Sequence, residues 1–585
     1  MLQAREPSDA TMGTLAGAPQ HFGHDCLRHA LTAVPQASDT PKPEDTFDVI
    51  VVGGGTAGSV LGGRLSADPS LRVAVLEAGG RGDSWVVRAP AAAVAMLPTR
   101  LNNYAFETVP QPGLDGRRGY QPRGRMLGGC SGMNAMVYIR GHASDYDHWA
   151  ALGNPGWSYA DLLPYFKRSE DNDSFEDAFH GRGGPLPVSA LRTGNPFHQH
   201  FMDAAREAGF PVNRDFNGAR QEGLGAYQVM QRGGERWSAA RAFLHPHIGQ
   251  RPNLDVRTGV QVTRLIFDEH DPRRVVGVEV RQQGRLMRLL ARREVVLSAG
   301  VFQSPQLLML SGIGPGDQLQ RLGIAVRHHL PGVGENLQDH PDFIFAYRAR
   351  SLDLMGFSPA GLWRTAREIG RYVRHRTGAI SSNYAEAGGF LKTNPALPAP
   401  DLQLHFVVSI AEDHARRLHA AHGYSCHVCL LRPRSRGRVS LRNPSPWEAP
   451  DIDPAFFQHP RDLDDMVQGF RLTRRLMDAP ALASRRQADL FTDGIETDEQ
   501  IRAVLRARTD SVYHPVGTCR MGPDAMAVVD AQLRVRGIDG LRVVDASVMP
   551  TLVGGNTQAP VVAIAEKAAD LIMGCAAPVA TPLAA

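Results

Sequence analysis

Three glycines and one glutamate near the start of the chain have the spacing of a dinucleotide-binding site. Gly53, Gly55 and Gly58 in VVGGGTAGSV directly follow the apolar run FDVIVV. In a GxGxxG turn the first glycine permits the tight turn, the second lets a pyrophosphate approach, and the third allows close helix packing. Glu77 comes 19 residues after Gly58, where a carboxylate can accept hydrogen bonds from an adenosine ribose. The pattern predicts a dinucleotide site but does not separate FAD from NAD.

The cysteines give a weaker signal. Cys426 and Cys429 form one CxxC, but no second ligand pair stands at zinc spacing, and their context HVCLLR is typical of a strand. We therefore predict no metal site. Six cysteines in 585 residues also do not resemble a secreted disulfide framework, which favours a reducing compartment.

The elements that must position the glycine turn form a strand, helix, strand unit. The apolar run at 47–52 enters the turn, a helical pattern follows, and VAVL at 73–76 supplies the second strand. VVLSAG at 295–300 and LRVVDAS at 541–547 predict further strands of the same parallel sheet. Residues 401–442 instead show the alternation of antiparallel strands, so we expect a second, sheet-containing domain there.

Composition excludes several classes of protein. Hydrophobic residues make up 43% of the chain and charged residues 21%, as in ordinary globular proteins. The 64 basic and 60 acidic residues are too evenly balanced for a nucleic-acid-binding surface. No apolar run is long enough to span a membrane, and the first 45 residues lack the apolar core of a secretory signal. We expect a mobile N-terminal arm over 1–45 and a cytoplasmic protein, at most peripheral at the inner membrane.

Several long motifs resemble those of the glucose-methanol-choline (GMC) oxidoreductases, closest to the bacterial alcohol and choline dehydrogenases. GRMLGGCSGMNAMVYIRG at 124–141 and SPQLLMLSGIGP at 304–315 resemble the two family signatures. Other stretches resemble family landmarks, namely PGVGENLQDH (331–340), SNYAEAGGF (382–390), YHPVGTCRMG (513–522), LRVVDASVMP (541–550) and GNTQAPVVAIAEKAADLI (555–572). The resemblance covers residues 47–573 and implies FAD.

The family fold is a mixed α/β architecture, with a Rossmann-type FAD-binding domain and a substrate-binding domain built on an antiparallel sheet. It implies a discontinuous FAD-binding domain at 46–155, 225–340 and 508–585, and a substrate-binding domain at 156–224 and 341–507. One departure matters for the cofactor. Some members carry a histidine, covalently attached to the flavin, where this chain has Met133, so we predict non-covalent FAD.

Oxidation of an alcohol by hydride transfer to a flavin requires a base that accepts the hydroxyl proton. A histidine suits this role, because its ordinary pKa of about 6.5 leaves the ring neutral near pH 7. By resemblance, His514 is the base and Asn556 binds the substrate oxygen. Pro560 occupies a favoured first-turn position, so a helix N-terminus should lie near Asn556 and stabilise negative charge on the flavin. The resemblance also implies which residues contact FAD. Besides the three glycines of the turn and Glu77, they are Thr56, Ala57, Gly128, Gly129, Asn134, Ala135, Val137, Val262, Asp545, Ala546, Asn556 and Thr557.

Four questions stay open at this level. Residues 84–106 are apolar but broken by two prolines, which favours a loop that covers a pocket or touches lipid, with a core segment as the alternative. Glu386 is either a partner for a cationic alcohol or a solvated or hydrogen-bonded glutamate. The electron acceptor is a quinone or similar molecule, or else oxygen, with release of hydrogen peroxide. The substrate is a primary alcohol, choline included, and a lyase of the same fold is a remote alternative; the oligomeric state does not follow from the sequence.

Overall fold

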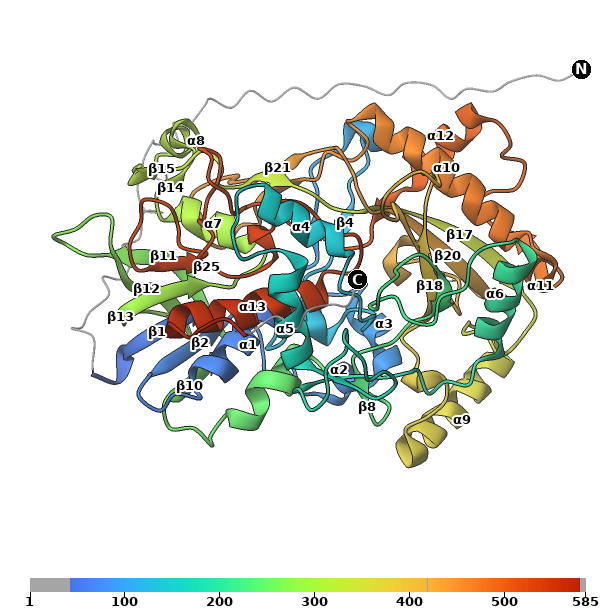
Figure 1. The fold of residues 1–585 in the computed structure, drawn as a ribbon, viewed down its shortest axis with the longest axis horizontal. Coiled ribbons are helices and arrows are strands. Elements are labelled where there is room, and N and C mark those ends of the chain that lie inside the picture. Colours follow the sequence, from blue (N-terminus) through green and yellow to red (C-terminus); the bar gives the residue numbers. More distant parts are fainter. Residues whose placement is uncertain (1–42, 418, 579–585) are drawn as a thin grey trace, which may run out of the picture. The chain divides into compact units, whose positions relative to one another are not determined.

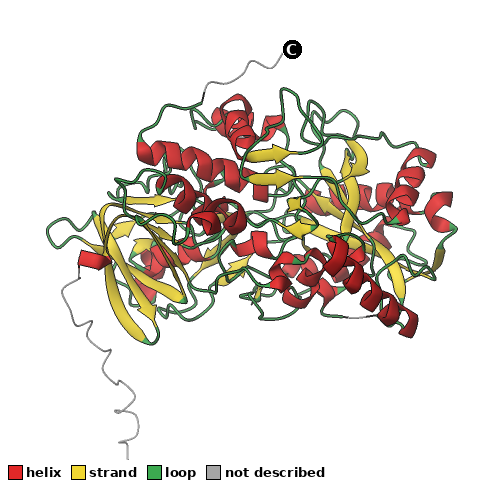
Figure 2. Ribbon diagram, turned by 90° about the horizontal axis from the view of Figure 1, so that it is seen from below, coloured by secondary structure: helices red, strands yellow, loops and turns green. Residues whose placement is uncertain are grey.

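The computed structural model describes residues 43–417 and 419–578. Most of the N-terminal arm predicted at 1–45 therefore lies outside the described residues. Its last three residues form a short 3-10 turn, η1 (Pro43–Asp45), which leads into the first strand. The predicted α/β fold is confirmed: two seven-stranded sheets organise the described chain, and Figure 2 shows their strands in two groups, one at each side of the view.

The first sheet contains the predicted parallel core. Its strands run in the order β10-β2-β1-β13-β12-β11, with β25 beside the second half of β13. The strands β10, β2, β1, β13 and β25 are mutually parallel, whereas β11 and β12 are antiparallel additions. Their bounds are β1 Thr46–Val52, β2 Val73–Glu77, β10 Leu254–Thr258, β11 Val260–Phe267, β12 Val275–Gln282, β13 Arg285–Leu297 and β25 Leu541–Val543.

Two helices that begin far apart in the sequence pack against each other, and one of them, α1 (Thr56–Leu65), contacts β1 and β2 of this sheet. Helix α1 starts at the glycine turn, and α13 (Gln558–Met573) starts just after Asn556. They contact each other along their lengths. At their N-terminal ends the Thr56 hydroxyl donates to the Gln558 side-chain carbonyl at 3.0 Å. Both helix N-termini are thereby held at the same edge of the sheet (Figure 1).

The second sheet is antiparallel and has one apolar face and one mixed face. Its order is β23-β17-β20-β19-β18-β7, and β24 pairs with β17. In β19, Leu402, Leu404 and Phe406 pack into a large apolar cluster with helix α10, whereas the alternate residues point to the other face. The bounds are β7 Gly223–Ala226, β17 Pro341–Ala349, β18 Ala385–Leu391, β19 Leu402–Val407, β20 His422–Leu430, β23 Arg486–Asp489 and β24 Asp510–Ser511.

The CxxC pair lies within β20. Cys426 packs in the apolar cluster beside α10, and Cys429 packs in a different cluster, so the two thiols occupy opposite faces of the sheet. Burial raises the pKa of both thiols well above the usual range. The two sulfur atoms therefore do not form one pair of metal ligands.

One strand of the 401–442 region, β21 (Gly437–Ser440) in the stretch GRVSLR, does not join this sheet. It pairs instead with β16 (Glu335–Leu337) and β22 (Asp451–Asp453) in a small separate sheet. The segment boundaries of the two domains stay a prediction. Within the described ranges, no helix is both long and apolar enough to cross a membrane.

The remaining elements connect and cover the two sheets. The other helices are α2 Trp85–Arg88, α3 Ala93–Met96, α4 Ala143–Ala151, α5 Tyr159–Ser169, α6 Pro196–Glu207, α7 Gln303–Leu310, α8 Gly316–Arg321, α9 Pro359–His375, α10 Pro460–Met477, α11 Pro480–Ala483 and α12 Asp498–Arg508. The other strands are β3 Phe106–Glu107, β4 Tyr120–Gln121, β5 Glu170–Asn172, β6 Leu186–Val188, β8 Gln231–Arg232, β9 Glu235–Arg236, β14 Ile313–Gly314 and β15 His328–His329.

Candidate active site

A cavity of about 1390 Å³ lies between the first sheet and the mixed face of the second. From the first sheet it is lined by residues at the carboxyl ends of the parallel strands, including Glu77 at the end of β2 and Ser298 after β13. Ligands of open parallel sheets bind at this edge. From the second sheet it is lined by His405 and Val407 of β19 and by His427 of β20. One wall of the cavity is therefore the edge of the first sheet where cofactors bind in such folds, and the opposite wall is the mixed face of the second sheet.

The glycine turn has the geometry that its spacing predicts. Gly53 has a φ of 99°, a conformation in which side chains are strained, and a Cβ on Gly58 would lie 1.9 Å from the Gly53 carbonyl oxygen. At Gly55 the nearest such atom is the Ser298 carbonyl oxygen, at 3.9 Å, and Gly55 lines the cavity. At Gly58 the turn therefore packs too tightly for a side chain, whereas at Gly55 it leaves room for a ligand. The N-terminus of α1 suits a phosphate group.

Glu77 is buried at the end of β2 and holds the turn. Its carboxylate accepts from the Gly54 backbone N–H at 3.0 Å and from the Gly79 N–H at 2.7 Å. Each carboxylate oxygen has a second acceptor position, so a ribose hydroxyl can still bind. Burial raises the pKa of Glu77.

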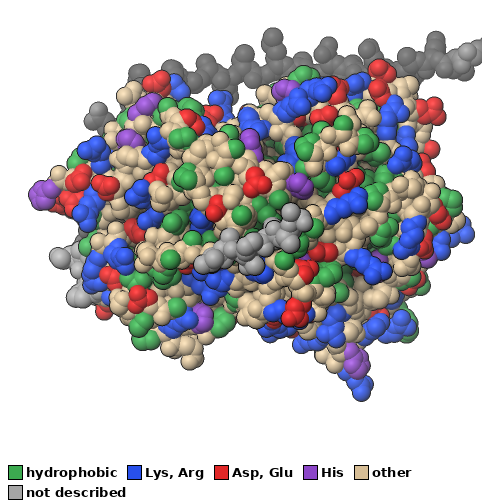
Figure 3. All heavy atoms as spheres, in the orientation of Figure 1, with side chains coloured by type: hydrophobic (Ala, Val, Ile, Leu, Met, Phe, Trp, Pro, Cys, Tyr) green, Lys and Arg blue, Asp and Glu red, His purple; other side chains and the backbone are tan. Residues whose placement is uncertain are grey.

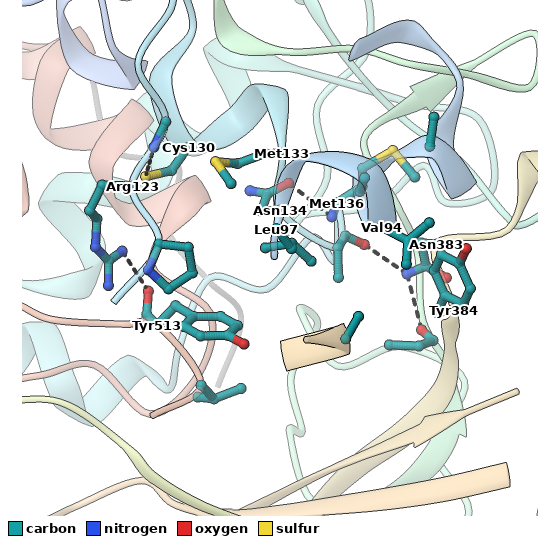
Figure 4. Close-up of a pocket in the computed structure, with 18 of the residues that line it drawn as sticks. Val94, Leu97, Arg123, Cys130, Met133, Asn134, Met136, Asn383, Tyr384 and Tyr513 are labelled. Atoms are coloured by element: carbon teal, nitrogen blue, oxygen red, sulfur yellow. Dashed lines mark hydrogen bonds between the residues drawn. The ribbon is translucent and has the colours of Figure 1, made fainter. Parts of the chain in front are cut away.

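A second glycine loop closes over the turn. Gly128, with a φ of 87°, donates its N–H to the Gly54 carbonyl oxygen at 2.7 Å. Asn134 accepts from the Met136 N–H at 3.0 Å, and both it and Met133 line the cavity (Figure 4). Met133 has no ring nitrogen that could bond a flavin, so non-covalent FAD stays the prediction at this position.

On the opposite side, Asp545 fixes the loop after β25. Its carboxylate accepts from the Gly300 N–H at 2.9 Å, the Ser304 hydroxyl at 2.6 Å and the Ser547 N–H at 2.8 Å. The cavity lining contains most of the residues predicted to contact the cofactor, namely Gly53, Gly55, Thr56, Ala57, Glu77, Gly129, Asn134, Ala135, Val137, Val262, Asp545, Ala546, Asn556 and Thr557. Gly58 and Gly128 do not line it but hold its walls, as described above.

His514 and Asn556, which are 42 positions apart in the chain, meet in this cavity. The Asn556 Nδ2 atom lies 3.2 Å from His514 Nε2, and the His514 Nδ1 atom lies 3.1 Å from Nδ1 of His340. The Nε2 atom of His340 lies 3.1 Å from the Leu431 carbonyl oxygen. The His514 backbone N–H donates to Asp339 at 2.9 Å, which fixes the loop.

These contacts determine the tautomer of each ring. The Leu431 carbonyl can only accept, so His340 carries its proton on Nε2 and accepts at Nδ1. His514 must then donate from its own Nδ1, which leaves the lone pair of Nε2 for the cavity. Asn556 donates to that lone pair, and an alcohol hydroxyl can take its place. His514 is oriented as a base.

The electrostatic surroundings keep these rings neutral. Burial, and then the neighbouring rings of His340 and His405, hold the pKa of His514 well below its usual range. Burial also lowers the pKa values of His340 and His405, each to about 3. A neutral imidazole can accept a proton, so the arrangement provides a base over the whole neutral range.

Gln403 fixes the orientation of Asn556. Its Nε2 donates to Asn556 Oδ1 at 2.9 Å and, at 3.3 Å, to the Tyr227 hydroxyl, which itself donates to the Leu404 carbonyl. With Oδ1 so engaged, the Nδ2 donor of Asn556 faces the cavity. Helix α13 begins two residues later, so its N-terminus lies near this pair in the sequence, as the position of Pro560 predicts.

Sequence reasoning overlooked three side chains of the site. His340 lies in PGVGENLQDH, which the sequence analysis identified only as a stretch resembling the family. The polar residues of that stretch were the signal that could have indicated a functional residue there. Gln403 and His405 lie on the cavity face of β19, where two-residue alternation could have located them. The 84–106 segment forms α2, α3 and the 3-10 turn η2 (Pro90–Ala92), and it does line the cavity. Glu386 does not: it is buried and accepts from Ser382 and Thr193.

The chain is similar to known proteins over most of its length. The chain is 44% identical to an alcohol dehydrogenase [acceptor] of Pseudomonas putida over 90% of this chain and 96% of that protein. It is 42% identical to the mitochondrial choline dehydrogenase of Homo sapiens, over 94% and 93% of the two chains. A solved formate oxidase of Aspergillus oryzae, from work on FAD modification, superimposes with a TM-score of 0.84 at 29% identity, over 90% of this chain and 98% of that one.

Two family descriptions account for most of the sequence. The N-terminal GMC oxidoreductase model matches residues 47–342, and the C-terminal GMC oxidoreductase model matches residues 433–565. Together they contain the glycine turn, the Gly128 loop, His340, His514 and Asn556. The chain belongs to the GMC oxidoreductase family, whose members are FAD-binding flavoproteins.

Proposed function

We propose that the protein oxidises a primary alcohol to the aldehyde, with FAD as the hydride acceptor and a quinone or similar molecule as the final acceptor. The observation that carries the proposal is the contact between His514 Nε2 and Asn556 Nδ2, which lie 3.2 Å apart. Both residues line the cavity that the glycine turn also lines. The alcohol dehydrogenase and choline dehydrogenases among the relatives support oxidation of an alcohol.

The residues present fit FAD. Gly55 leaves space for a pyrophosphate, Glu77 has acceptor positions left for a ribose, and the loops of Asn134 and Asp545 provide the walls. When bound, FAD supplies the two-electron acceptor for the substrate C–H bond. The N-termini of α1 and α13 favour negative charge at this edge of the sheet.

The protein's own groups perform the proton transfer. Asn556 donates from Nδ2 to the substrate oxygen and holds it beside His514. The Nε2 lone pair of His514 then accepts the hydroxyl proton, while His340 keeps the other ring nitrogen protonated. Both rings are buried. The alkoxide character that develops on the substrate favours loss of its C–H hydride.

An apolar alcohol suits the walls of the cavity best. Val94 and Leu97 from the α3 region, with Tyr384 near β18, line it on the substrate side (Figure 4). The Tyr384 hydroxyl donates to the Ala91 carbonyl at 3.0 Å, so its ring presents carbon to the cavity. Apolar walls with a few polar groups are typical of sites for apolar small molecules. We therefore place aliphatic and aromatic primary alcohols ahead of sugars.

Choline is the second candidate, and one observation favours it. Asp342 of β17 lines the cavity with a buried carboxylate that pairs with His427 Nδ1 at 2.6 Å. A carboxylate in this position can face a quaternary ammonium group. The contact with His427 already occupies one of its oxygens, which is why choline comes second.

A reduction series tests the proposal. The FAD-loaded protein is mixed anaerobically with 1-octanol, benzyl alcohol, glucose and choline, and bleaching of the flavin is recorded. We expect reduction by the first two alcohols, and rapid reoxidation by a soluble quinone compared with oxygen. Bleaching by choline alone favours the second candidate, reoxidation mainly by oxygen with release of peroxide favours an oxidase, and no bleaching by any alcohol contradicts the proposal.

A further inference from the structure

Helix α9 (Pro359–His375) exposes an apolar stripe along most of its length. Only Gly361, Glu368 and Tyr372 of its residues are buried. Leu362, Ala366, Ile369 and Val373 recur at spacings of four, three and four residues, which places them on one face of the helix. The exposed fractions are 62% for Leu362, 69% for Trp363, 50% for Ile369 and 67% for Val373. No residue in the described part of the chain covers this face.

The other exposed face of α9 is basic. It carries Arg364, Arg367, Arg371 and Arg374, against the single, buried Glu368. Arg367 and Arg374 have no carboxylate partner within the described ranges, and Arg367 instead stacks on the Trp363 ring at 5.6 Å. In the space-filling view, basic and histidine side chains gather at the lower right, where α9 projects in Figure 1 (Figure 3).

The stripe continues into the rim of the cavity. Leu362, Ile369 and Val373 line the cavity together with the exposed Trp85 of α2 and with Val94 of α3. The 3-10 turn η7 (Ala379–Ser381) contacts both α9 and η2, and so connects the two parts. We call these five residues the apolar rim. All five are exposed and line the same cavity, and exposed apolar side chains gathered at one site mark interaction sites.

We infer that the apolar rim docks on an anionic lipid bilayer, with α9 lying in the interface and the mouth of the cavity facing the lipid. A helix with an exposed apolar face and an arginine-rich face has the composition of an interfacial helix. Trp363 and Trp85 are suited to the headgroup level. A second copy of this chain fits less well, because its α9 carries the same excess of arginine, and two basic helices repel each other, whereas anionic lipid attracts both. An apolar alcohol or quinone dissolved in the bilayer would then reach the cavity without crossing water.

Vesicle sedimentation of the full-length FAD-loaded protein tests this inference. The vesicles are pure phosphatidylcholine, or an equal mixture of phosphatidylcholine and phosphatidylglycerol. We expect binding to the mixed vesicles, weakened by salt, and much weaker binding to the neutral ones. The stripe variant Leu362→Ser/Ile369→Ser/Val373→Ser should lose at least roughly tenfold in binding. The variant Arg367→Gln/Arg374→Gln should lose roughly fivefold for each arginine at low salt.

The matched control is Leu152→Ser/Val212→Ser/Met526→Ser, which removes three exposed apolar side chains that do not line the cavity; it should bind as wild type. Flavin content verifies that each variant is folded. His514→Ala should bind vesicles like wild type, so failure of the proposed chemistry and failure of the docking surface give different results. The inference is overturned if wild type stays in the supernatant with mixed vesicles, if the stripe variant binds equally well, or if the rim proves to mediate a dimer that only the stripe variant dissociates.

Discussion

The Nδ1 atoms of His340 and His514 lie 3.1 Å apart, with the rings nearly perpendicular at 89°. Two imidazoles can share this contact only if one nitrogen carries the proton and the other does not. The Leu431 carbonyl, 3.1 Å from His340 Nε2, decides which. His340 is thereby a positioning residue for the base, since it directs the free lone pair of His514 toward the substrate.

Replacement of His340 tests this positioning role. His340→Ala should slow anaerobic flavin reduction roughly 10- to 100-fold, the scale expected when a reactive group loses its orientation. The amide of His340→Asn can place an acceptor near the original Nδ1, so this variant should recover part of the rate.

A pH profile separates positioning from a merely structural role. In wild type, burial keeps the pKa of His514 well below its usual range, so the reduction rate should be flat from pH 8 to pH 6. In His340→Ala, water replaces the ring and moves that pKa upward toward about 6.5. The rate should then begin to fall on the acid side at a higher pH than in wild type. Superimposable pH profiles would contradict the assigned role.

The orientation of Asn556 depends on Gln403. Gln403→Leu removes the donor to Asn556 Oδ1, so the amide can rotate and present its oxygen to the substrate. We expect reduction to slow by roughly tenfold, the value of one misplaced hydrogen bond to a developing charge. The double variant Gln403→Leu/Asn556→Ala should be no slower than Asn556→Ala. Additive losses would show that Gln403 acts by another route.

Substitution of Gly58 and substitution of Gly55 in the glycine turn should affect different properties of the protein. A Cβ on Gly58 would lie 1.9 Å from the Gly53 carbonyl oxygen, so Gly58→Ala should lower the free energy of unfolding by at least about 2 kcal/mol. A Cβ on Gly55 meets open space inside the cavity. Gly55→Ala should keep the melting temperature of the apoprotein but weaken FAD binding roughly tenfold or more. Flavin titration and thermal melts distinguish them; equal stability of both apoproteins contradicts the packing argument.

Glu386 should make stability depend on pH. Burial raises the pKa of Glu386 to about 7, although the hydrogen bonds from the Ser382 and Thr193 hydroxyls act to lower it. The folded state therefore holds a proton that the unfolded chain releases above its own pKa, near 4.5. Each pH unit between these values costs about 1.4 kcal/mol of stability as the pH rises. Glu386→Gln cannot ionise, so its melting temperature relative to wild type should increase from pH 5 to pH 7 and then level off. A constant difference contradicts this assignment.

The sequence predicted those parts of the molecule that depend on local spacing. The runs at 47–52, 73–76, 295–300 and 541–547 became β1, β2, β13 and β25, and the glycines lie where the spacing requires. What it could not predict depends on long-range pairing. GRVSLR has the alternation of a strand, but alternation does not say which partner it takes, and β21 pairs outside the large sheet. The contact of His340 with His514 joins positions 174 apart, and no local pattern contains it.

The most direct measurement is the rate of anaerobic flavin reduction in wild type and in His514→Ala, with the alcohol that reduces wild type fastest. We expect the variant to retain bound FAD, because His514 is not among the residues predicted to contact the cofactor. We expect its rate to fall by roughly 10²- to 10⁴-fold, the usual contribution of a general base. A variant that holds flavin and is reduced at nearly the wild-type rate would contradict the assignment of His514 as the base.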